Sequence, residues 1–373
     1  MIYLDSTATT QMSKKALDVY KSYAYDFFYN PSAGYVSSVK VAKDIQDGRD
    51  YILKRLGADK GTVVFTSGAT EANNLAIKGS FREGNWEYVF SEGEHSSVFN
   101  TAKALKNEGK IVKFISLDKF GEINYDELDK SVNEKTRLVS LIYVSNETGA
   151  INDIEKIVKI IKAKNKKTLI HIDGVQAFNK IPFSLAKLDV DFLSFSSHKF
   201  HGPKGIGGLY VKNIEALKSI VFGGGQEFGK RSGTENVAGI MATKEAVKEI
   251  DVQKNFEKVQ ALKNRFLEFY KDKEDVKVFE TKRSSPYILS ISYKGVNGET
   301  LMRALENEII IGTGSACGSK TAGNRVLEAI GLSKERVKSS VRVSFDPSLS
   351  ISDVEFASKK IYEVYKNILE KVK

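Results

Sequence analysis

Short β-rich runs alternate with helical stretches between about residue 60 and residue 215, and this alternation limits the possible folds more than any other feature of the chain. Several of the runs are almost continuously apolar, as strands are when both faces of their sheet are covered. Helical stretches such as Glu71–Lys78 and Ile154–Lys164 separate them. This order predicts an α/β domain with a mostly parallel sheet. The predicted strands are Thr62–Thr66, Glu87–Ser91, Ile111–Ser116, Arg137–Val144, Thr168–Asp173, Asp189–Ser196 and Gly207–Val211.

The pattern changes after residue 234. Residues 259–269 carry apolar side chains at helical spacing, and a strand-like run follows at Ile288–Tyr293. Helices are predicted near 325–330 and 353–371. The chain of 373 residues is long enough for two domains. We therefore expect a smaller α+β domain to follow the first one, beginning near residue 260.

The chain is basic, with 57 Lys and Arg against 47 Asp and Glu and a formal net charge of +10. Lysines between residues 156 and 167 alternate with Ile157, Ile160 and Ile161, as on the solvated face of an amphipathic helix. The alternative is a docking face for an acidic protein or a nucleic acid. No arginine-rich or aromatic-interleaved stripe supports it, and we expect no direct binding of nucleic acid.

Membrane segments, disulfides and metal centres are not expected. No apolar run approaches the roughly 18 residues of a membrane span, and Asp5 interrupts the place where a signal peptide would need its apolar core. We therefore expect a cytoplasmic protein. The single cysteine, Cys317, excludes an intrachain disulfide and a multi-cysteine metal site. The four histidines show no HExxH spacing, and we expect no metal.

Two polar residues follow apolar strands, at the edge where ligands bind in open α/β sheets. Lys199 comes directly before a Gly/Pro turn, and a lysine in such a place can form a Schiff base. Most isolated lysines lie on exposed loops, but the flanking residues favour a functional interpretation here. Asp173 ends another strand. It either caps a helix or holds the protonated ring nitrogen of pyridoxal phosphate (PLP).

Three further segments carry chemistry. The strand–glycine–helix junction Thr66–Asn74 offers free backbone N–H groups to a phosphate, although Thr70 is also an ordinary helix-capping residue. Cys317 lies among Gly, Ser and Thr, which is typical of an accessible loop and a nucleophilic thiolate, whereas a lone cysteine is more often a buried small hydrophobe. Arg342 lies in an alternating strand pattern, where it is either exposed or binds a carboxylate.

In order and spacing these segments resemble the cysteine desulfurases, PLP enzymes of the class V aminotransferase family and of fold type I. The resemblance covers essentially the whole chain, and the Ser-Ala-Cys sequence is similar to group I, whose cysteine lies on a long mobile loop. The matching segments are Tyr3–Thr10, Asn30–Ser32, Phe65–Glu71, Glu94–His95, Ser145–Gly149, His171–Asp173, Ser197–Lys199, Arg231–Thr234 and Gly314–Cys317.

The resemblance implies a fold with two domains. Residues 11–258 would form a large PLP-binding domain with a mostly parallel seven-stranded sheet between helices. Residues 1–10 and 259–373 would form a smaller α+β domain that carries the loop with the catalytic cysteine.

The resemblance also implies catalytic roles. Lys199 would hold PLP as a Schiff base, and Asp173 would pair with the ring nitrogen. His95 would stack on the ring and handle protons, while Gln176 would bond to the ring hydroxyl. Cys317 would be the nucleophile that receives sulfur.

The phosphate and the substrate would be bound by other residues. Asn146 and Arg342 would bind the substrate carboxylate, and Asn146 would also contact the cofactor. Thr234 would reach the phosphate in the other subunit of a homodimer. Within one subunit, the phosphate would be held by Ala69, Thr70, Ser196 and His198.

The implied reaction converts L-cysteine to L-alanine. Lys199 would take the α-proton, and Cys317 would attack the substrate sulfur and become a persulfide. The sulfur would pass to an acceptor protein, either an iron–sulfur scaffold or an enzyme that thiolates tRNA or a cofactor.

The chain departs from the family pattern at several positions. Ser6 and Thr7 replace a more usual Asn-Ala, and the loop from Gly318 to Asn324 is short. After residue 344 the chain reads Phe-Asp-Pro where Leu-Gly-Arg is common. A second arginine is therefore absent there, and carboxylate binding should depend more heavily on Arg342.

Two alternatives remain open. A PLP-dependent aminotransferase of the same fold would not need Cys317, and a selenocysteine lyase would prefer selenocysteine to cysteine. A catalytically silent scaffold or RNA-binding protein would use only the basic surface, and the presence of Lys199, Asp173, His95 and Cys317 argues against it.

Overall fold

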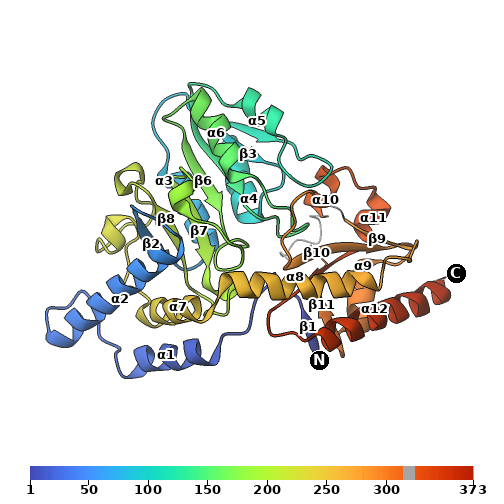
Figure 1. Cartoon of the computed structure of the whole chain (residues 1–373). Coiled ribbons are helices and arrows are strands. Elements are labelled where there is room, and N and C mark those ends of the chain that lie inside the picture. Colours follow the sequence, from blue (N-terminus) through green and yellow to red (C-terminus); the bar gives the residue numbers. More distant parts are fainter. Residues whose placement is uncertain (280, 314–323, 373) are drawn as a thin grey trace.

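The structure is a computed structural model that describes residues 1–279, 281–313 and 324–372. At its centre lies a seven-stranded sheet with the order β2-β8-β7-β6-β5-β3-β4 (Figure 1). Neighbouring strands from β7 to β4 are parallel, and β8 is antiparallel to both β2 and β7. The predicted mostly parallel sheet is confirmed. Its strands are β2 (Thr62–Thr66), β3 (Glu87–Ser91), β4 (Ile111–Ile115), β5 (Thr136–Ile142), β6 (Leu169–Asp173), β7 (Phe192–Ser196) and β8 (Gly207–Val211).

Some strands are shorter than the sequence predicts. The strand predicted from Asp189 begins at Phe192, and the Asp191 carboxylate accepts a hydrogen bond from the backbone N–H of Ile170 at 2.8 Å. The strand predicted to reach Ser116 ends one residue earlier, where Glu127 accepts the Ser116 N–H at 2.8 Å.

Helices cover both faces of this sheet, and alternate strand residues supply the two cores. On β3, Tyr88 and Phe90 pack with α3 and α4, whereas Val89 joins the core that contains α2, α6 and α7. Helix α1 packs against α7, and α5 lies beside α6. The bounds are α1 Lys14–Tyr25, α2 Val36–Arg55, α3 Ala69–Gly79, α4 Ser96–Asn107, α5 Tyr125–Ser131, α6 Ile154–Lys164 and α7 Val237–Glu249, with short 3₁₀ helices at Leu185–Lys187, Ser197–Lys199, Ile214–Ala216 and Glu227–Gly229.

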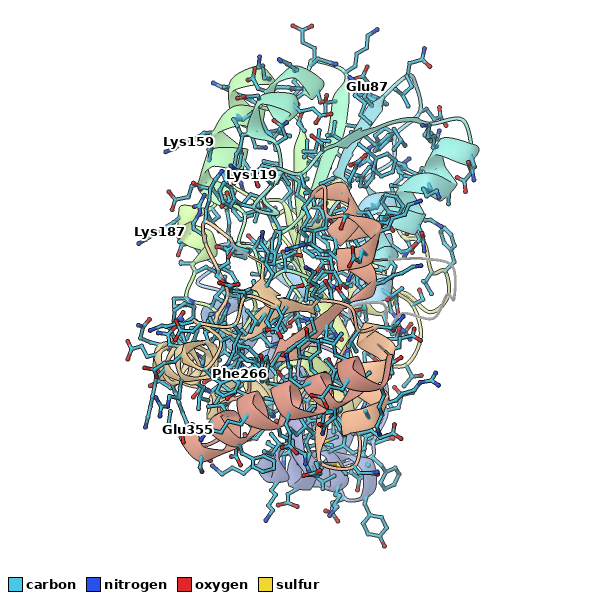
Figure 2. All side chains as sticks on the ribbon, turned by 90° about the vertical axis from the view of Figure 1, so that its right-hand side faces the viewer. Glu87, Lys119, Lys159, Lys187, Phe266 and Glu355 are labelled. Carbon is cyan, nitrogen blue, oxygen red and sulfur yellow. The ribbon has the colours of Figure 1, made fainter. Side chains whose placement is uncertain are left out.

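Helix α6 has the amphipathic character that the sequence predicts. Ile157 and Ile161 are buried, while Lys159 is exposed. Figure 2 shows the side chain of Lys159 projecting from the surface, as does that of Lys187. The lysine-rich segment therefore forms a solvated face that is anchored by buried isoleucines.

Two smaller sheets lie beside the central one (Figure 1). Strands β12, β10 and β9 form an antiparallel sheet in that order, and β1 pairs in parallel with β11. Buried residues of α8 and α12, among them Phe266 and Tyr365, pack in a core that continues into the central sheet. The bounds are β1 Ile2–Leu4, β9 Val276–Val278, β10 Ile288–Tyr293, β11 Ile309–Ile311, β12 Ser340–Ser344, α8 Val252–Glu268, α9 Gly298–Leu305, α10 Arg325–Ala329, α11 Lys334–Lys338 and α12 Ile351–Val372.

The N-terminal segment connects the two parts. Asp5 forms a β-bridge with Ser344 on β12, and the Thr10 N–H donates to the carbonyl of His198 at 2.9 Å. The division of the chain between residues 258 and 259 stays a prediction, and α8 contains that point. None of the helices in the described ranges is long and apolar enough to cross a membrane.

Candidate active site

A cavity of about 580 Å³ opens at the carboxyl ends of the strands, where the N-terminal segment and α10 approach the sheet. Ligands bind at this edge of open α/β sheets. The structure brings most of the predicted site residues together on the cavity wall, although their roles stay predictions. Those on the wall are Ala69, Thr70, His95, Asn146, Asp173, Gln176, Ser196, His198, Lys199 and Arg342.

Of the described residues that were predicted for the site, one is not on this wall, and a further predicted residue falls outside the described ranges. Thr234 is exposed and lies outside the cavity lining. Cys317 lies outside the residues that the structure describes, as does most of the loop predicted to carry it.

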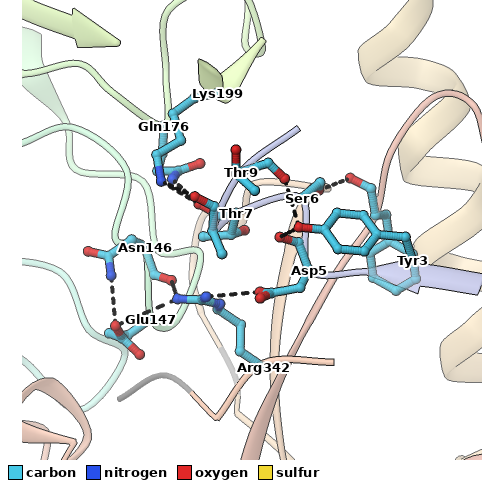
Figure 3. A network of polar contacts seen from close by, with 12 residues as sticks. Tyr3, Asp5, Ser6, Thr7, Thr9, Asn146, Glu147, Gln176, Lys199 and Arg342 are labelled. Atoms are coloured by element: carbon cyan, nitrogen blue, oxygen red, sulfur yellow. Dashed lines mark hydrogen bonds and ion pairs between the residues drawn. The ribbon is translucent and has the colours of Figure 1, made fainter. Parts of the chain in front are cut away.

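Lys199 is the last residue of the 3₁₀ turn that follows β7, and it faces the N-terminal segment. Its Nζ donates hydrogen bonds to the backbone carbonyls of Thr7 and Ala8, both at 2.8 Å. The Nε2 of Gln176 donates to the same Thr7 carbonyl at 3.1 Å (Figure 3). The backbone of the N-terminal segment thus orients two cavity side chains, which explains the closeness of two segments far apart in the sequence.

Asp173 is buried at the end of β6, and both of its carboxylate oxygens accept hydrogen bonds. Oδ2 accepts from Asn73 Nδ2 at 2.9 Å, and Oδ1 accepts from the backbone N–H of Val175 at 3.1 Å. Asn73 Nδ2 also donates to Ser97 Oγ at 2.9 Å. Of the two sequence interpretations, helix capping is wrong, because no helix begins at Asp173. The carboxylate is instead held rigidly at the cavity.

His95 caps the N-terminus of α4 and is held by the same network. Its Nδ1 accepts the backbone N–H of Ser97 at 3.2 Å and lies 2.8 Å from Ser97 Oγ. A neutral ring whose Nδ1 accepts a hydrogen bond carries its proton on Nε2. Burial lowers the pKa of His95, although the negative charge of Asp173 opposes that change. The ring is therefore neutral at pH 7.

The N-terminus of α3 forms one end of the cavity. Its capping residue is Gly68, which has no side chain to satisfy the N–H groups of the first turn, and Thr70 lies within that turn. The expected capping role of Thr70 is therefore wrong. A Cβ added to Gly207 would lie 2.6 Å from the Phe195 carbonyl and 2.8 Å from the Gly68 backbone, so these segments approach closely only because residue 207 is glycine. The arrangement suits an anion.

His198 flanks this end of the cavity. Its Nδ1 lies 3.0 Å from Thr9 Oγ1. Burial, and next the positive charge of Lys199, lower the pKa of His198 to about 4. The side chain is neutral at pH 7 and can take part in hydrogen bonding but carries no charge toward a phosphate.

Arg342 forms the opposite corner of the cavity. It is only 5% exposed, which excludes the interpretation of an exposed strand arginine. Nη2 donates to Asp5 Oδ1 and Nη1 to the Asn146 carbonyl, both at 3.0 Å, and the Glu147 carboxylate lies 3.7 Å from Nη1. Figure 3 shows the guanidinium between the two acidic side chains. The guanidinium is thus oriented by carboxylates from two separate segments.

Several residues that line the cavity were not predicted from the sequence. Asn73 and Glu147 lie inside recognisable motifs, but no pattern assigned them a task. Glu94 is fully buried, and burial raises the pKa of its carboxyl to about 8, with the nearby charge of Asp173 adding to the rise. Arg325 enters the cavity from α10. The only sequence feature that could have identified Arg325 is its position shortly after the predicted cysteine loop.

A buried lysine outside the cavity wall supports Gln176. Lys180 Nζ donates to Gln176 Oε1 at 2.9 Å. Because the Thr7 carbonyl can only accept, the Gln176 atom that faces it is Nε2, and Oε1 is directed to Lys180. Burial and the charge of Lys199 lower the pKa of Lys180 to about 7.

The donors and acceptors on the wall fit PLP. A held carboxylate suits a protonated ring nitrogen, Lys199 supplies a primary amine, and the uncapped N-terminus of α3 suits the phosphate. In the described ranges, no three His, Cys, Asp or Glu side chains lie close enough together to bind a metal ion.

Known proteins resemble the chain over nearly its whole length. The class V aminotransferase family model matches residues 2–356. A protein of Lactobacillus delbrueckii subsp. bulgaricus named NifS/IcsS protein homolog is 37% identical over 98% of both chains. Cysteine desulfurase IscS of Clostridium botulinum is 33% identical over 98% of this chain and 94% of its own. A solved structure named NIFS-like protein superimposes with a TM-score of 0.92 at 31% identity, covering 98% of this chain and 99% of that one.

Proposed function

Because the chain belongs to the class V aminotransferase family and, within it, to the cysteine desulfurases, we propose that it converts L-cysteine to L-alanine with PLP as its cofactor and with transfer of the sulfur to Cys317. The observation that carries this proposal is the convergence of Lys199, Asp173, Gln176 and His95 on one cavity.

Each of these side chains has a proposed task. Bound PLP supplies an electron sink that makes the α-proton of an amino acid removable. Asp173, held by Asn73, would keep the ring nitrogen protonated. Lys199 Nζ would hold the cofactor and move the α-proton, while Gln176 Nε2 would bond to the ring hydroxyl. His95, neutral and fixed through Nδ1, would stack on the ring and offer Nε2 for proton transfer.

Substrate recognition and sulfur transfer complete the proposal. Arg342 and Asn146 bind the α-carboxylate. The Cys317 thiolate attacks the substrate sulfur, and the bond between that sulfur and Cβ breaks. The electron pair stays with Cβ, which takes up a proton to become the methyl group of alanine, and Cys317 is left as a persulfide.

We further propose a homodimer in which Thr234 reaches the phosphate site of the partner. Thr234 is exposed and outside its own cavity, which suits a contact in the partner. Large apolar side chains are also exposed on α1, α2 and the loops nearby, where a second copy would cover them. They are Tyr25, Phe28, Tyr35, Val36, Val39, Phe222 and Phe228. A molar mass of twice 41.4 kDa by light scattering would agree.

A cytoplasmic location and a sulfur-acceptor protein complete this proposal. A thiolate nucleophile needs a reducing compartment to avoid oxidation. The acceptor would be an iron–sulfur scaffold or an enzyme that thiolates tRNA or a cofactor, and the exposed lysines of α6 suit an acidic one.

The deciding experiment measures alanine formed from L-cysteine, together with the mass of the protein. Wild type should form alanine and gain one sulfur atom, and Cys317→Ser should do neither. Because the chain has one cysteine, the added mass is assigned without ambiguity. If alanine does not form, or if the variant equals wild type, an aminotransferase or another lyase activity replaces the proposal.

A further inference from the structure

A second guanidinium group lines the cavity from an element that no sequence pattern connected with the substrate. Arg325 is the first residue of α10. One edge of its guanidinium is fixed, because Nη2 donates to the Glu94 carbonyl and Cζ lies 3.8 Å from the centroid of the Phe99 ring. The other edge of the guanidinium is not fixed, because Nη1 is buried and has no hydrogen-bond partner among the described residues.

A buried donor without a partner is costly, so native structures rarely keep one unless a water or ligand completes it. Arg325 therefore presents an unfilled, charged donor at the wall of the cavity. Its planar fork of N–H groups matches the two oxygens of a carboxylate better than it matches a thiol.

The charges around Arg342 show why a second cation is needed. Its Nη atoms already contact the carboxylates of Asp5 and Glu147, so one positive charge faces two acidic groups. A substrate carboxylate bound by Arg342 alone would be the third acidic group around that one positive charge. Among the described residues, the other cations on the wall are Lys199, which the proposed function assigns to the cofactor, and Lys204, which is exposed.

We propose that Arg325 binds the α-carboxylate of the amino acid substrate together with Arg342, an inference that rests on the proposed function. Arg325 thereby replaces the arginine that is absent after residue 344 in this chain. The second cation reaches the carboxylate from α10 on one side of the cavity, whereas Arg342 reaches it from β12 on the other.

The test compares two ligands that differ by a carboxylate. L-Alanine is the product of the proposed reaction, and ethylamine is the same molecule without its carboxylate. Binding of each to the PLP-loaded holoenzyme is followed by the change in cofactor absorbance. The proteins are wild type, Arg325→Gln, Arg325→Lys and, as a matched control, Arg336→Gln on α11, which does not line the cavity.

We expect Arg325→Gln to weaken L-alanine binding roughly 10- to 100-fold, the usual effect of losing a charged hydrogen bond. Ethylamine binding should not change, Arg325→Lys should recover part of the loss, and Arg336→Gln should equal wild type. With L-cysteine, KM should rise while kcat changes little.

Two results would overturn the inference while leaving the proposed function intact. One is an equal loss for both ligands, which means that Arg325 only supports the fold of the cavity. The other is unchanged L-alanine binding in Arg325→Gln. A wild-type holoenzyme that forms no alanine from L-cysteine overturns the proposed function and this inference with it.

Discussion

The two ends of the cavity differ in how completely their polar groups are satisfied. At the cofactor end, both oxygens of Asp173 accept hydrogen bonds, and Lys199 and Gln176 meet the same Thr7 carbonyl. The uncharged hydroxyl of Thr7 is the buried atom there that lacks a partner among the described residues. At the substrate end, three buried atoms have no hydrogen-bond partner among the described residues. These are Glu94 Oε2, Arg325 Nη1 and Arg342 Nε.

The difference indicates what each end is built to hold. A site that keeps one resident group can be organised in advance by its own side chains, which reduces the cost of ordering it. A site through which substrate and product pass leaves donors and acceptors that a ligand completes. Substitutions at the two ends should therefore have different consequences.

Removal of the cavity lysine should have the largest effect. Lys199→Ala deletes both the amine that holds the cofactor and the group that moves the α-proton, so desulfurase activity should fall by at least about 10³-fold. The measurement is alanine formation by the PLP-supplemented protein, and the normal yellow absorbance of the bound cofactor should also disappear. Activity within tenfold of wild type would show that another residue performs these tasks.

The next largest loss of activity is expected when Asn73, which hydrogen-bonds to Asp173, is replaced. Asn73→Ala removes the bonds to both Asp173 and Ser97, and we expect kcat to fall roughly 10- to 100-fold, as for other residues that orient a catalytic group. The neighbouring Asn74→Ala is the matched control, because Asn74 lies outside the cavity lining and should stay near wild type. Equal kcat values in the two variants would contradict the rigidity that we assign to the cofactor end.

At the substrate end, we expect Glu94 to make the stability of the protein depend on pH. Burial raises the pKa of Glu94 to about 8, above the value near 4.3 expected in the unfolded chain. Between these values the native state binds more protons than the unfolded state, so Glu94 makes stability fall as pH rises.

Glu94→Gln keeps the shape of the protonated acid and removes its titration. The variant should match wild type near pH 4 and exceed it by about 1 to 3 kcal/mol at pH 8 in urea unfolding of the cofactor-free protein. A stability difference that does not change with pH would show that Glu94 does not titrate as described.

A pH effect of similar size but opposite sign is expected at Lys180, which lies behind Gln176. The pKa of Lys180 is lowered to about 7, first by burial and next by the charge of Lys199, while Asp346 opposes the shift and Arg342 adds to it. The unfolded chain binds more protons between pH 7 and 10, so this lysine makes stability rise with pH.

Lys180→Met should remove that rise. Relative to wild type, the variant should lose about 1 to 3 kcal/mol between pH 7 and pH 10 in the cofactor-free protein. Lys263→Met is a useful comparison, because Lys263 is also buried, with a pKa of about 8, but bonds to Ser284, Ser285 and Ile288 away from the cavity. Of these two variants, Lys180→Met should also alter the absorbance of the bound cofactor, since Lys180 bonds to Gln176 and Lys263 does not.

The order of residues along the chain is enough to predict the central sheet and most of the cavity wall. Continuous apolar runs separated by amphipathic helices leave a parallel sheet as the arrangement that buries both faces. Motifs that follow strands must then meet at one edge, and Asp173, Ser196 and Lys199 do so. Local order along the chain carries this information, because strand and helix periods are local properties.

The hydrogen-bond and ion-pair partners of these residues follow from the packing of the folded chain. Asn73 beneath Asp173 and the paired carboxylates at Arg342 come from segments far apart in sequence. No periodicity records such contacts, because they depend on how helices and the N-terminal segment pack on the sheet. Arg325 is the clearest case, because no sequence motif includes it. Its buried Nη1 donor lies at the cavity only because α10 packs against one side of the cavity.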